Sequence, residues 1–457
     1  MPLPYDQLAA IRLGFGLSPR LSLPDSPGGV VSSVAMAAPD GEAVTMDMIR
    51  EMQNELRSLS QQARKGGQEE DRARRQFRQM MGRRYLDSIL SRFARALDDP
   101  AGFGERLVAF WASHFTVRGG TPHTDLMVAA LVDEAIRPHL SGRFADMLFA
   151  AETHPAMLIY LDQIRSVGPN SVAARKNRDK MLGVNENLAR EMIELHSLGV
   201  GAGYTQADIE GLARLLTGLS YDPRRPGVFQ PALSEPGAEA ILGESFGSHR
   251  NRGTLEDVQA VIGELAGHEA TAHHLARKMA VHFVADDPPE SLVGRLAGVF
   301  LDTGGDLGAM NLTLAEAPEL ATHFRQKLRQ PFDFVVAGLR ALGVSGQDLR
   351  AVDRRRFQQG VLQPMAVMGQ PWARPGGPDG WPEEAEAWGT PQGIAMRINW
   401  AMRQPAEMLD RLPDPRDFLT TALGDAASEP LRWAVPRAES RAEGVALVLA
   451  SADFNRR

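Results

Sequence analysis

The chain has 457 residues, of which 43% are hydrophobic and 23% are charged, as in an ordinary soluble globular protein. Its net charge of -7 is mild for this length and argues against a dedicated nucleic-acid-binding protein, which would carry a strong basic excess. There is no cysteine, so disulfides, thiolate metal sites, iron–sulfur clusters and cysteine nucleophiles are excluded.

The N-terminal residues predict neither export nor membrane insertion. They lack the basic start and following apolar run of a signal peptide. No stretch reaches the roughly 18 apolar residues that a membrane-spanning helix needs. We therefore expect a soluble protein without a membrane span, cytoplasmic by default.

The first 84 residues change composition three times. Residues 1–20 contain a short apolar helix candidate and are expected to belong to the main domain. Residues 21–47 are rich in Pro, Gly, Ser and Ala, which predicts a loop. The following charged stretch predicts a solvated helix or helical hairpin interrupted at Gly66-Gly67, with a basic docking patch as the alternative. We interpret residues 21–84 as an insertion.

Beyond residue 84, apolar residues recur at helical spacing in segment after segment. Helices are expected over residues 105–117, 126–136, 144–150, 255–265, 271–284, 291–301, 332–342 and 441–451. Two long Pro/Gly-rich loops interrupt the pattern at 221–253 and 370–390, and five of the six tryptophans lie at or beyond Trp372. The sequence predicts an all-α fold with little or no sheet, and residues 85–457 as its main domain.

The stretch from 185 to 208 predicts a helix, a glycine-rich reversal and the start of a second helix. Apolar residues at helical spacing on the first helix are expected to pack inward: Leu188, Met192 and Leu195. A polar stripe occupies another face: Asn187, Arg190, Glu191 and Glu194. Thr205 and Asp208 are explained as a capping box that starts the second helix.

Three residues are candidates for acid–base chemistry. Glu191 and Glu194 lie one turn apart, and such a pair divides acid and base roles when burial separates the two pKa values. The alternative is that Arg190 neutralises Glu194 in a surface ion pair. His114 lies beside Trp111 on the border of an apolar face, which fits either a core histidine or an acid–base group.

The histidines around residue 270 do not predict a zinc site. His268 and His273 are five residues apart, which turns the second by roughly 140° from the first on a helix. His274, Lys278 and His282 share a face, but a lysine between two histidines opposes a metal cation. We predict no metal ligands, and the cofactor stays unknown.

Nine stretches, in order, resemble DUF1800, a bacterial family of unknown function. They are RLGFGLSP at 12–19, FWASHFTV at 110–117, PAMLIYLD at 155–162, NENLAREMIELHSLGVGAGYTQAD at 185–208, ARLLTG at 213–218, TAHHLARKMAVHFVADDPP at 271–289, PFDFVVAGLRALG at 331–343, DGWPEEAEAW at 379–388 and LASADFNRR at 449–457. Residues 21–82 fall outside this resemblance.

The resemblance implies a largely α-helical protein and a partner from a second uncharacterised family, DUF1501. Members of DUF1501 resemble alkaline-phosphatase-type sulfatases and often carry a twin-arginine export signal, so export in complex with such a partner to the periplasm is an open alternative. The family's polar motif residues match His114, Asn185, Glu186, Asn187, Arg190, Glu191, Glu194, Lys278 and His282.

Three positions depart from the family pattern. Leu219 stands where the family usually has Trp, Ser234 where it has His, and Glu239 where it has Lys. If that histidine and lysine serve an active site, this chain has a weakened or altered one.

Two functions are therefore expected from the sequence. The first is a non-catalytic partner or maturation factor for a DUF1501 protein, with the polar residues forming a buried structural network. The alternative is a hydrolase or group-transfer enzyme, with Glu191 or Glu194 as base and His114 as acid or base. Its substrate-binding residues would be Asn187, Arg190, Lys278 and His282. A single enzyme site requires these side chains to reach one substrate, so a shared cavity is the structural test.

Overall fold

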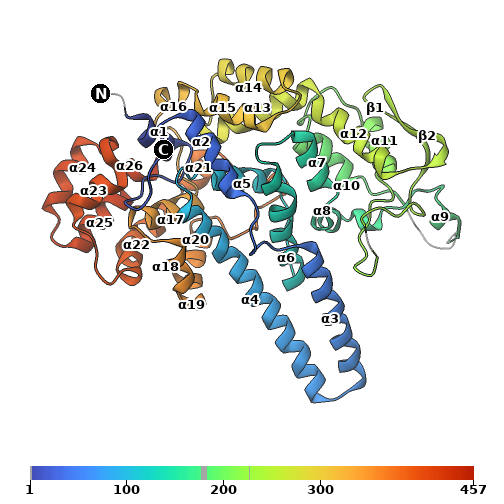
Figure 1. Cartoon of the computed structure of the whole chain (residues 1–457), viewed down its shortest axis with the longest axis horizontal. Coiled ribbons are helices and arrows are strands. Elements are labelled where there is room, and N and C mark those ends of the chain that lie inside the picture. Colours follow the sequence, from blue (N-terminus) through green and yellow to red (C-terminus); the bar gives the residue numbers. More distant parts are fainter. Residues whose placement is uncertain (1–2, 177–182, 226) are drawn as a thin grey trace.

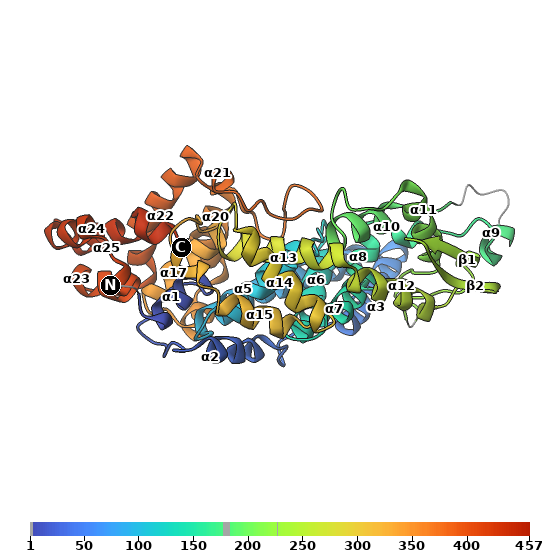
Figure 2. The same cartoon turned by 90° about the horizontal axis from the view of Figure 1, so that it is seen from above.

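The computed structural model describes residues 3–176, 183–225 and 227–457, and most of them are helical. The described residues contain two strands, β1 (Pro236–Ile241) and β2 (Glu244–Arg252), which pair antiparallel as a hairpin. The predicted all-α fold with little sheet is confirmed. Figures 1 and 2 show an elongated body with this hairpin at one end and the C-terminal helices, in red, at the other.

Many of the helices follow one another closely, and longer connections lie at residues 13–26, 216–235 and 368–384. The first half of the chain forms α1 (Tyr5–Arg12), α2 (Pro27–Ser32), α3 (Met46–Lys65), α4 (Gln68–Asp98), α5 (Phe103–His114), α6 (Pro122–Leu131), α7 (Phe144–Glu152), α8 (Pro155–Tyr160), α9 (Val172–Lys176), α10 (Asn187–Glu191) and α11 (Gln206–Leu215). Between the strands and residue 351 lie α12 (Leu255–Gly267), α13 (Glu269–Phe283), α14 (Glu290–Asp302), α15 (Leu307–Ala315), α16 (Glu319–Thr322), α17 (Pro331–Ala341) and α18 (Gly346–Ala351). The C-terminal part forms α19 (Arg354–Phe357), α20 (Gln363–Val367), α21 (Ala385–Trp388), α22 (Pro391–Met408), α23 (Pro415–Leu423), α24 (Glu429–Ala434), α25 (Arg441–Ala450) and α26 (Ala452–Asn455).

The helices α3 and α4 form a hairpin that projects from the body (Figure 1). Gly66 ends α3 and Gly67 precedes α4, so the predicted interruption at this glycine pair is confirmed. The helix α4 then continues without a break past residue 84 and packs in the body against α6, α17 and α18. The hairpin is thus joined rigidly to the body through a single long helix.

Two large groups of buried apolar side chains fill the body. One surrounds Trp111 and Phe144 and packs α5 to α8 against α11 to α15. The other surrounds Phe93 and Trp400 and packs α4 and α17 against α22, α23 and α25. Because α4 and α5 follow each other closely, the two groups of helices meet along these two elements.

Gly102 fixes the start of α5. Its φ of +71° lies in the left-handed region, and a Cβ there would stand 2.8 Å from the backbone nitrogen of Phe15. This close approach sets α5 against the N-terminal segment. As a result Arg106, one turn into α5, donates a hydrogen bond to the carbonyl of Gly14 at 3.1 Å.

Residues 455–457 lie beside residues 327–329. The backbone of Lys327 and that of Arg457 exchange hydrogen bonds of 3.2 Å and 2.9 Å. This pairing places the Arg457 side chain inside the body, where it is fully buried. No helix of the described residues is both long and apolar enough to cross a membrane.

Candidate functional site

The polar stripe begins on α10, which gives way at Met192 to a π turn over Met192–His196. Leu188 and Met192 are buried as predicted, but the expectation that Leu195 packs inward was wrong, since Leu195 is only half-buried. A π turn contains more residues than an α turn, so the following side chains are rotated about the helix axis. It brings Ile193 and His196 inward instead.

Most of the polar stripe faces outward. Arg190 contacts Glu186 at 3.2 Å and Glu194 at 3.5 Å, and the Arg190 side chain is 39% exposed. Glu194 also accepts a hydrogen bond of 3.0 Å from the hydroxyl of Tyr204, and Asn187 is exposed. The surface ion pair that the sequence offered as the alternative for Arg190 and Glu194 is therefore present.

Glu191 differs from the rest of the stripe. It is half-buried, and burial raises the pKa of its carboxyl above the ordinary value, although His196 opposes the shift. Glu194 and Glu152 raise this pKa further through their negative charge. A carboxyl with a raised pKa takes up a proton more readily than its neighbours, as a general base must.

His114 belongs to a buried histidine cluster, made of His114, His196, His274 and Glu152. The Nδ1 of His196 donates to Oε1 of Glu152 at 2.6 Å, and both side chains are fully buried. His114 donates from Nε2 to the carbonyl of His196 at 3.2 Å, and the two rings lie 5.7 Å apart. His274 donates to the carbonyl of Leu195 at 3.2 Å. Four side chains from four helical segments thus converge.

Burial is the main cause that holds the pKa of His114 well below its usual value, and the charge of Lys278 adds to the effect. With Nε2 donating to a carbonyl, its Nδ1 carries no proton in the neutral ring. This nitrogen is buried and has no hydrogen-bond partner among the described residues. His114 is therefore a neutral histidine with an unused acceptor.

Lys278 lies on α13 one turn after His274 and one turn before His282. It is half-buried, and its amine has no hydrogen-bond or ion-pair partner among the described residues. Burial lowers the pKa of its amine to about 8, although Glu383 and Asp379 oppose the shift. At this pKa a sizeable fraction of the amine is neutral at mildly alkaline pH.

His282 belongs to a second group, the charged cluster, made of Arg106, His282, Lys327, Asp333, Glu383 and Arg457. The Nδ1 of His282 donates to Oε1 of Glu383 at 2.6 Å, and its Nε2 accepts from Arg106 at 2.9 Å. Since Nε2 must accept, the ring is neutral. Burial lowers the pKa of His282 to about 4, although Glu383 opposes this.

Carboxylates neutralise the buried cations of the charged cluster. Asp333 lies 3.3 Å from Arg106 and 3.5 Å from Arg457. Burial would raise the pKa of Glu383, but His282, Lys327 and Arg457 outweigh it and lower that pKa to about 2. Lys327 donates to the backbone carbonyl of Glu383 at 2.7 Å. The cluster joins α5, α13, α17, the C-terminal residues and the loop before α21.

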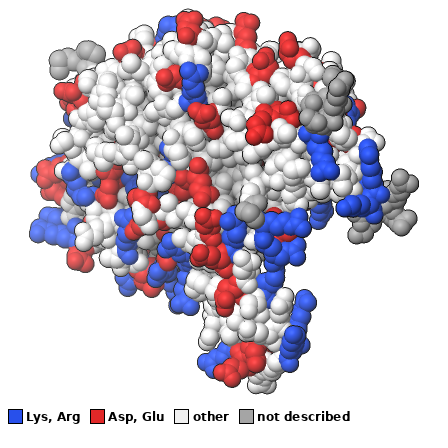
Figure 3. Space-filling view, turned by 45° about the vertical axis from the view of Figure 1, so that its right-hand side comes forward, with Lys and Arg blue, Asp and Glu red and all other residues white. Residues whose placement is uncertain are grey.

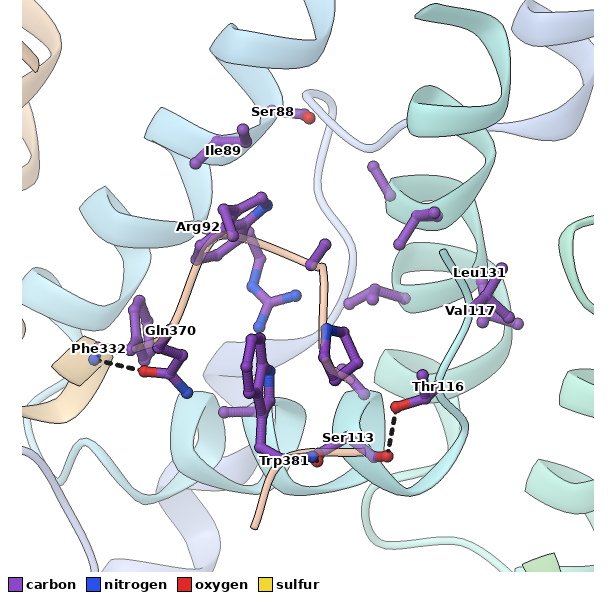
Figure 4. Close-up of a pocket in the computed structure, with 18 of the residues that line it drawn as sticks. Ser88, Ile89, Arg92, Ser113, Thr116, Val117, Leu131, Phe332, Gln370 and Trp381 are labelled. Atoms are coloured by element: carbon purple, nitrogen blue, oxygen red, sulfur yellow. Dashed lines mark hydrogen bonds between the residues drawn. The ribbon is translucent and has the colours of Figure 1, made fainter. Parts of the chain in front are cut away.

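A cavity of about 130 Å³ adjoins the charged cluster, where α4, α5 and α6 meet the loop before α21 (Figure 4). Gln370 accepts a hydrogen bond of 2.7 Å from the backbone of Phe332 and donates one of 3.0 Å to Gln330. Ser113 accepts one of 2.9 Å from the backbone N–H of Trp381. These bonds hold the loop in place as one wall of the cavity.

Only one of the predicted site residues, His282, lines this cavity. The others do not line it: His114, Asn187, Arg190, Glu191, Glu194 and Lys278. Sequence reasoning missed the residues that shape it, among them Arg92, Gln370 and Trp381. The concentration of tryptophans beyond residue 371 was the available signal, because aromatic side chains commonly wall ligand pockets.

The three positions that depart from the family pattern lie elsewhere. Ser234 is buried and donates to the carbonyl of Pro231 at 3.0 Å, and Glu239 on β1 accepts from Arg214 at 2.8 Å. Leu219 is fully buried in the first apolar group. Each has a structural partner, and none lines the cavity.

Within the described residues no group of three or more His, Asp or Glu side chains is placed to hold a metal ion.

No curated protein and no solved structure matches the chain. One family model, described as "Protein of unknown function (DUF1800)", matches residues 9–456, which is nearly the whole chain. This match agrees with the nine motifs that the sequence shares, in order, with the family, and the chain belongs to the DUF1800 family.

Proposed function

We propose that this protein is a non-catalytic partner or maturation factor of a sulfatase-like DUF1501 protein, and that it docks through the α3–α4 hairpin. The observation that carries this proposal is the opposite charge of the projecting element. Residues 46–84 of the hairpin contain ten basic and six acidic residues, a net charge of +4 on a chain whose net charge is -7. The excess lies in residues 57–84, nearer the turn, which contain nine basic and three acidic residues.

The basic side chains of the hairpin are accessible. Seven of the nine are exposed: Arg57, Arg64, Lys65, Arg72, Arg75, Arg78 and Arg83. Figure 3 shows Lys and Arg along the sides of the projecting part, with acidic residues gathered near its end. A positive element that stands away from a negative body steers an acidic partner surface towards itself. The hairpin therefore suits an acidic docking face.

The docking proposal predicts that charge reversal on the hairpin weakens the complex. In the triple variant Arg72→Glu, Arg75→Glu and Arg78→Glu, we expect the dissociation constant for the DUF1501 protein encoded nearest this gene to rise at least about tenfold. Calorimetric titration at low and high salt measures it, and the wild-type affinity should fall with added salt.

The matched control reverses three exposed arginines at the far end of the body, Arg403, Arg411 and Arg416. Its dissociation constant should stay within about twofold of wild type, since long-range charge effects are screened by salt. If wild type forms no complex, or if both triple variants bind equally well, the hairpin is not the docking element.

A second candidate function is supported by Lys278 and Glu191. We infer a hydrolase or group-transfer site in which Glu191, or its neighbour Glu194, acts as base and His114 as acid or base. Lys278, together with Arg190, would hold an anionic substrate group. The supporting observation is the pair of opposite pKa shifts, up for Glu191 and down to about 8 for Lys278.

This candidate predicts that Lys278→Met lowers kcat/KM for anionic ester substrates about 100-fold or more, the usual loss on removing an acid–base or charge-holding group. Lys65→Met, at an exposed position, should leave the rate unchanged. A panel of carboxylate, phosphate and sulfate esters provides the assay. If wild type turns over none of these esters, or if Lys278→Met retains the wild-type rate, the proposed enzyme site is contradicted.

A further inference from the structure

The walls of the cavity beside α4 are largely apolar. The apolar lining residues include Phe115, Val117, Phe332, Trp372 and Trp381. Figure 4 shows Val117 and Phe332 on opposite sides of the cavity and Trp381 below them. A volume of about 130 Å³ holds on the order of four water molecules, and an apolar cavity of roughly 150 Å³ is known to admit benzene, so it admits a small organic molecule. Aromatic walls of this kind favour a ligand with an apolar body, because its burial releases water from both surfaces.

Four acidic residues also line the cavity, and each already faces a cation. Their partners are as follows: Asp133 with Arg137 at 3.0 Å, Glu383 with Lys327 at 3.7 Å, Asp333 with Arg106 at 3.3 Å, and Glu42 with Arg350 at 3.0 Å. These carboxylates are committed, so the cavity has little negative charge left to bind a cation.

Arg92 is the exception among the cations that line the cavity. Its nearest carboxylate oxygen belongs to Glu105 and lies 3.8 Å from Nε, beyond hydrogen-bonding range. Glu105 is instead held by both terminal nitrogens of Arg137, at 2.6 Å and 3.1 Å. The Nε of Arg92 is buried and has no hydrogen-bond partner within the described part of the chain.

The Arg92 side chain extends from α4 into the cavity, as Figure 4 shows, and its guanidinium lies 5.7 Å from the ring centre of Trp372. Burial lowers its pKa to about 10, with Arg137 adding to the shift, so Arg92 stays protonated at neutral pH. Its side chain is only 15% exposed. A cation placed so deep, with so little compensation, has a strong preference for an anion beside it.

We propose that this cavity binds a small organic monocarboxylate with an aromatic or branched apolar body. The carboxylate lies against Arg92, and the apolar body lies between Trp372 and Trp381. One guanidinium presents two parallel donors that match the two oxygens of a carboxylate. A dianion such as a phosphate ester fits less well, because only one positive charge is free and Asp133 and Glu383 stand nearby.

Calorimetric titration of the full chain with 3-phenylpropionate and with its uncharged amide, 3-phenylpropionamide, tests this proposal. We expect the acid to bind wild type at least tenfold more tightly than the amide. In Arg92→Met the acid should lose at least tenfold in affinity and the amide less than threefold, so that the acid preference disappears. Inorganic phosphate should not displace the acid at equal concentration.

The control Arg416→Met removes an exposed arginine from α23 and should bind both probes as wild type does. The Arg92→Met protein should melt no earlier than wild type, because an unbranched apolar chain replaces a poorly compensated charge. Absence of acid binding in wild type, an acid preference kept in Arg92→Met, or displacement by phosphate each overturns the proposal. None of these results depends on whether the hairpin docks a partner.

Discussion

Glu105→Gln is expected to lower the free energy of unfolding by about 3–5 kcal/mol, the range for breaking a buried ion pair by removing one partner. Arg137 is fully buried and donates two hydrogen bonds to the Glu105 carboxylate. A neutral amide cannot accept both hydrogen bonds, and it leaves Asp133, 3.0 Å from Nε of Arg137, as the remaining carboxylate beside the guanidinium. Arg92 loses its nearest carboxylate in the same variant. Urea unfolding at pH 7 measures the change.

An exposed ion pair serves as the control for this variant. Asp87 lies 2.7 Å from Arg354, with the two side chains 36% and 54% exposed. Asp87→Asn should cost no more than about 1 kcal/mol, since water screens such a pair. If Glu105→Gln lowers the free energy of unfolding as little as Asp87→Asn does, water must reach the ion pair between Glu105 and Arg137.

Helices were predictable from the sequence because their signals are local. The apolar spacing that contains Trp111 marks α5, and the capping box of Thr205 and Asp208 marks the start of α11. Each depends only on residues within one or two turns, and the structure confirms both. The interruption at Gly66-Gly67 is of the same kind.

The internal geometry of the 185–208 stretch was not predictable in the same way. A regular period of 3.6 residues places Leu195 inward, whereas the π turn buries His196. The reason is tertiary: Glu152 on α7 offers a buried acceptor 2.6 Å from His196. Glu152 lies 44 residues away in the sequence, so no local pattern around His196 predicts this contact.

The sequence placed Lys278 and His282 on one face of a helix correctly, and their assignment to one substrate-binding site stays a prediction. In the fold His282 enters the charged cluster, whose members Arg106 and Arg457 lie 176 and 175 residues away in sequence. Such convergence depends on how whole helices pack. The roles assigned to Glu191, Glu194, His114 and Lys278 therefore stay predictions. Arg92 could not be identified from the sequence, because its place in the cavity depends on the packing of α4 against the loop that contains Trp372.

Acidification should destabilise the protein steeply between pH 6.5 and pH 4. His274 and His282 have pKa values lowered from 6.5 to about 4, mainly by burial. Between these two pH values the unfolded chain binds protons that the folded chain does not, so stability is complete above pH 6.5 and falls as the pH drops to 4. Each such group contributes roughly 3 kcal/mol at most. Urea unfolding at half-unit pH intervals measures the slope.

His282→Gln separates this effect from general acid unfolding. A glutamine amide can still donate towards Glu383 and accept from Arg106, but it does not titrate. We expect the variant to be less stable than wild type at pH 7 and to lose less stability between pH 6.5 and pH 4. His273→Gln, an exposed position on the same helix, should keep the wild-type slope. Equal slopes in all three proteins would mean that the pKa of His282 is the same in the folded and unfolded chain, so that the folded ring takes up its proton near pH 6.5. The hydrogen bond that its Nε2 accepts from Arg106 opposes such protonation.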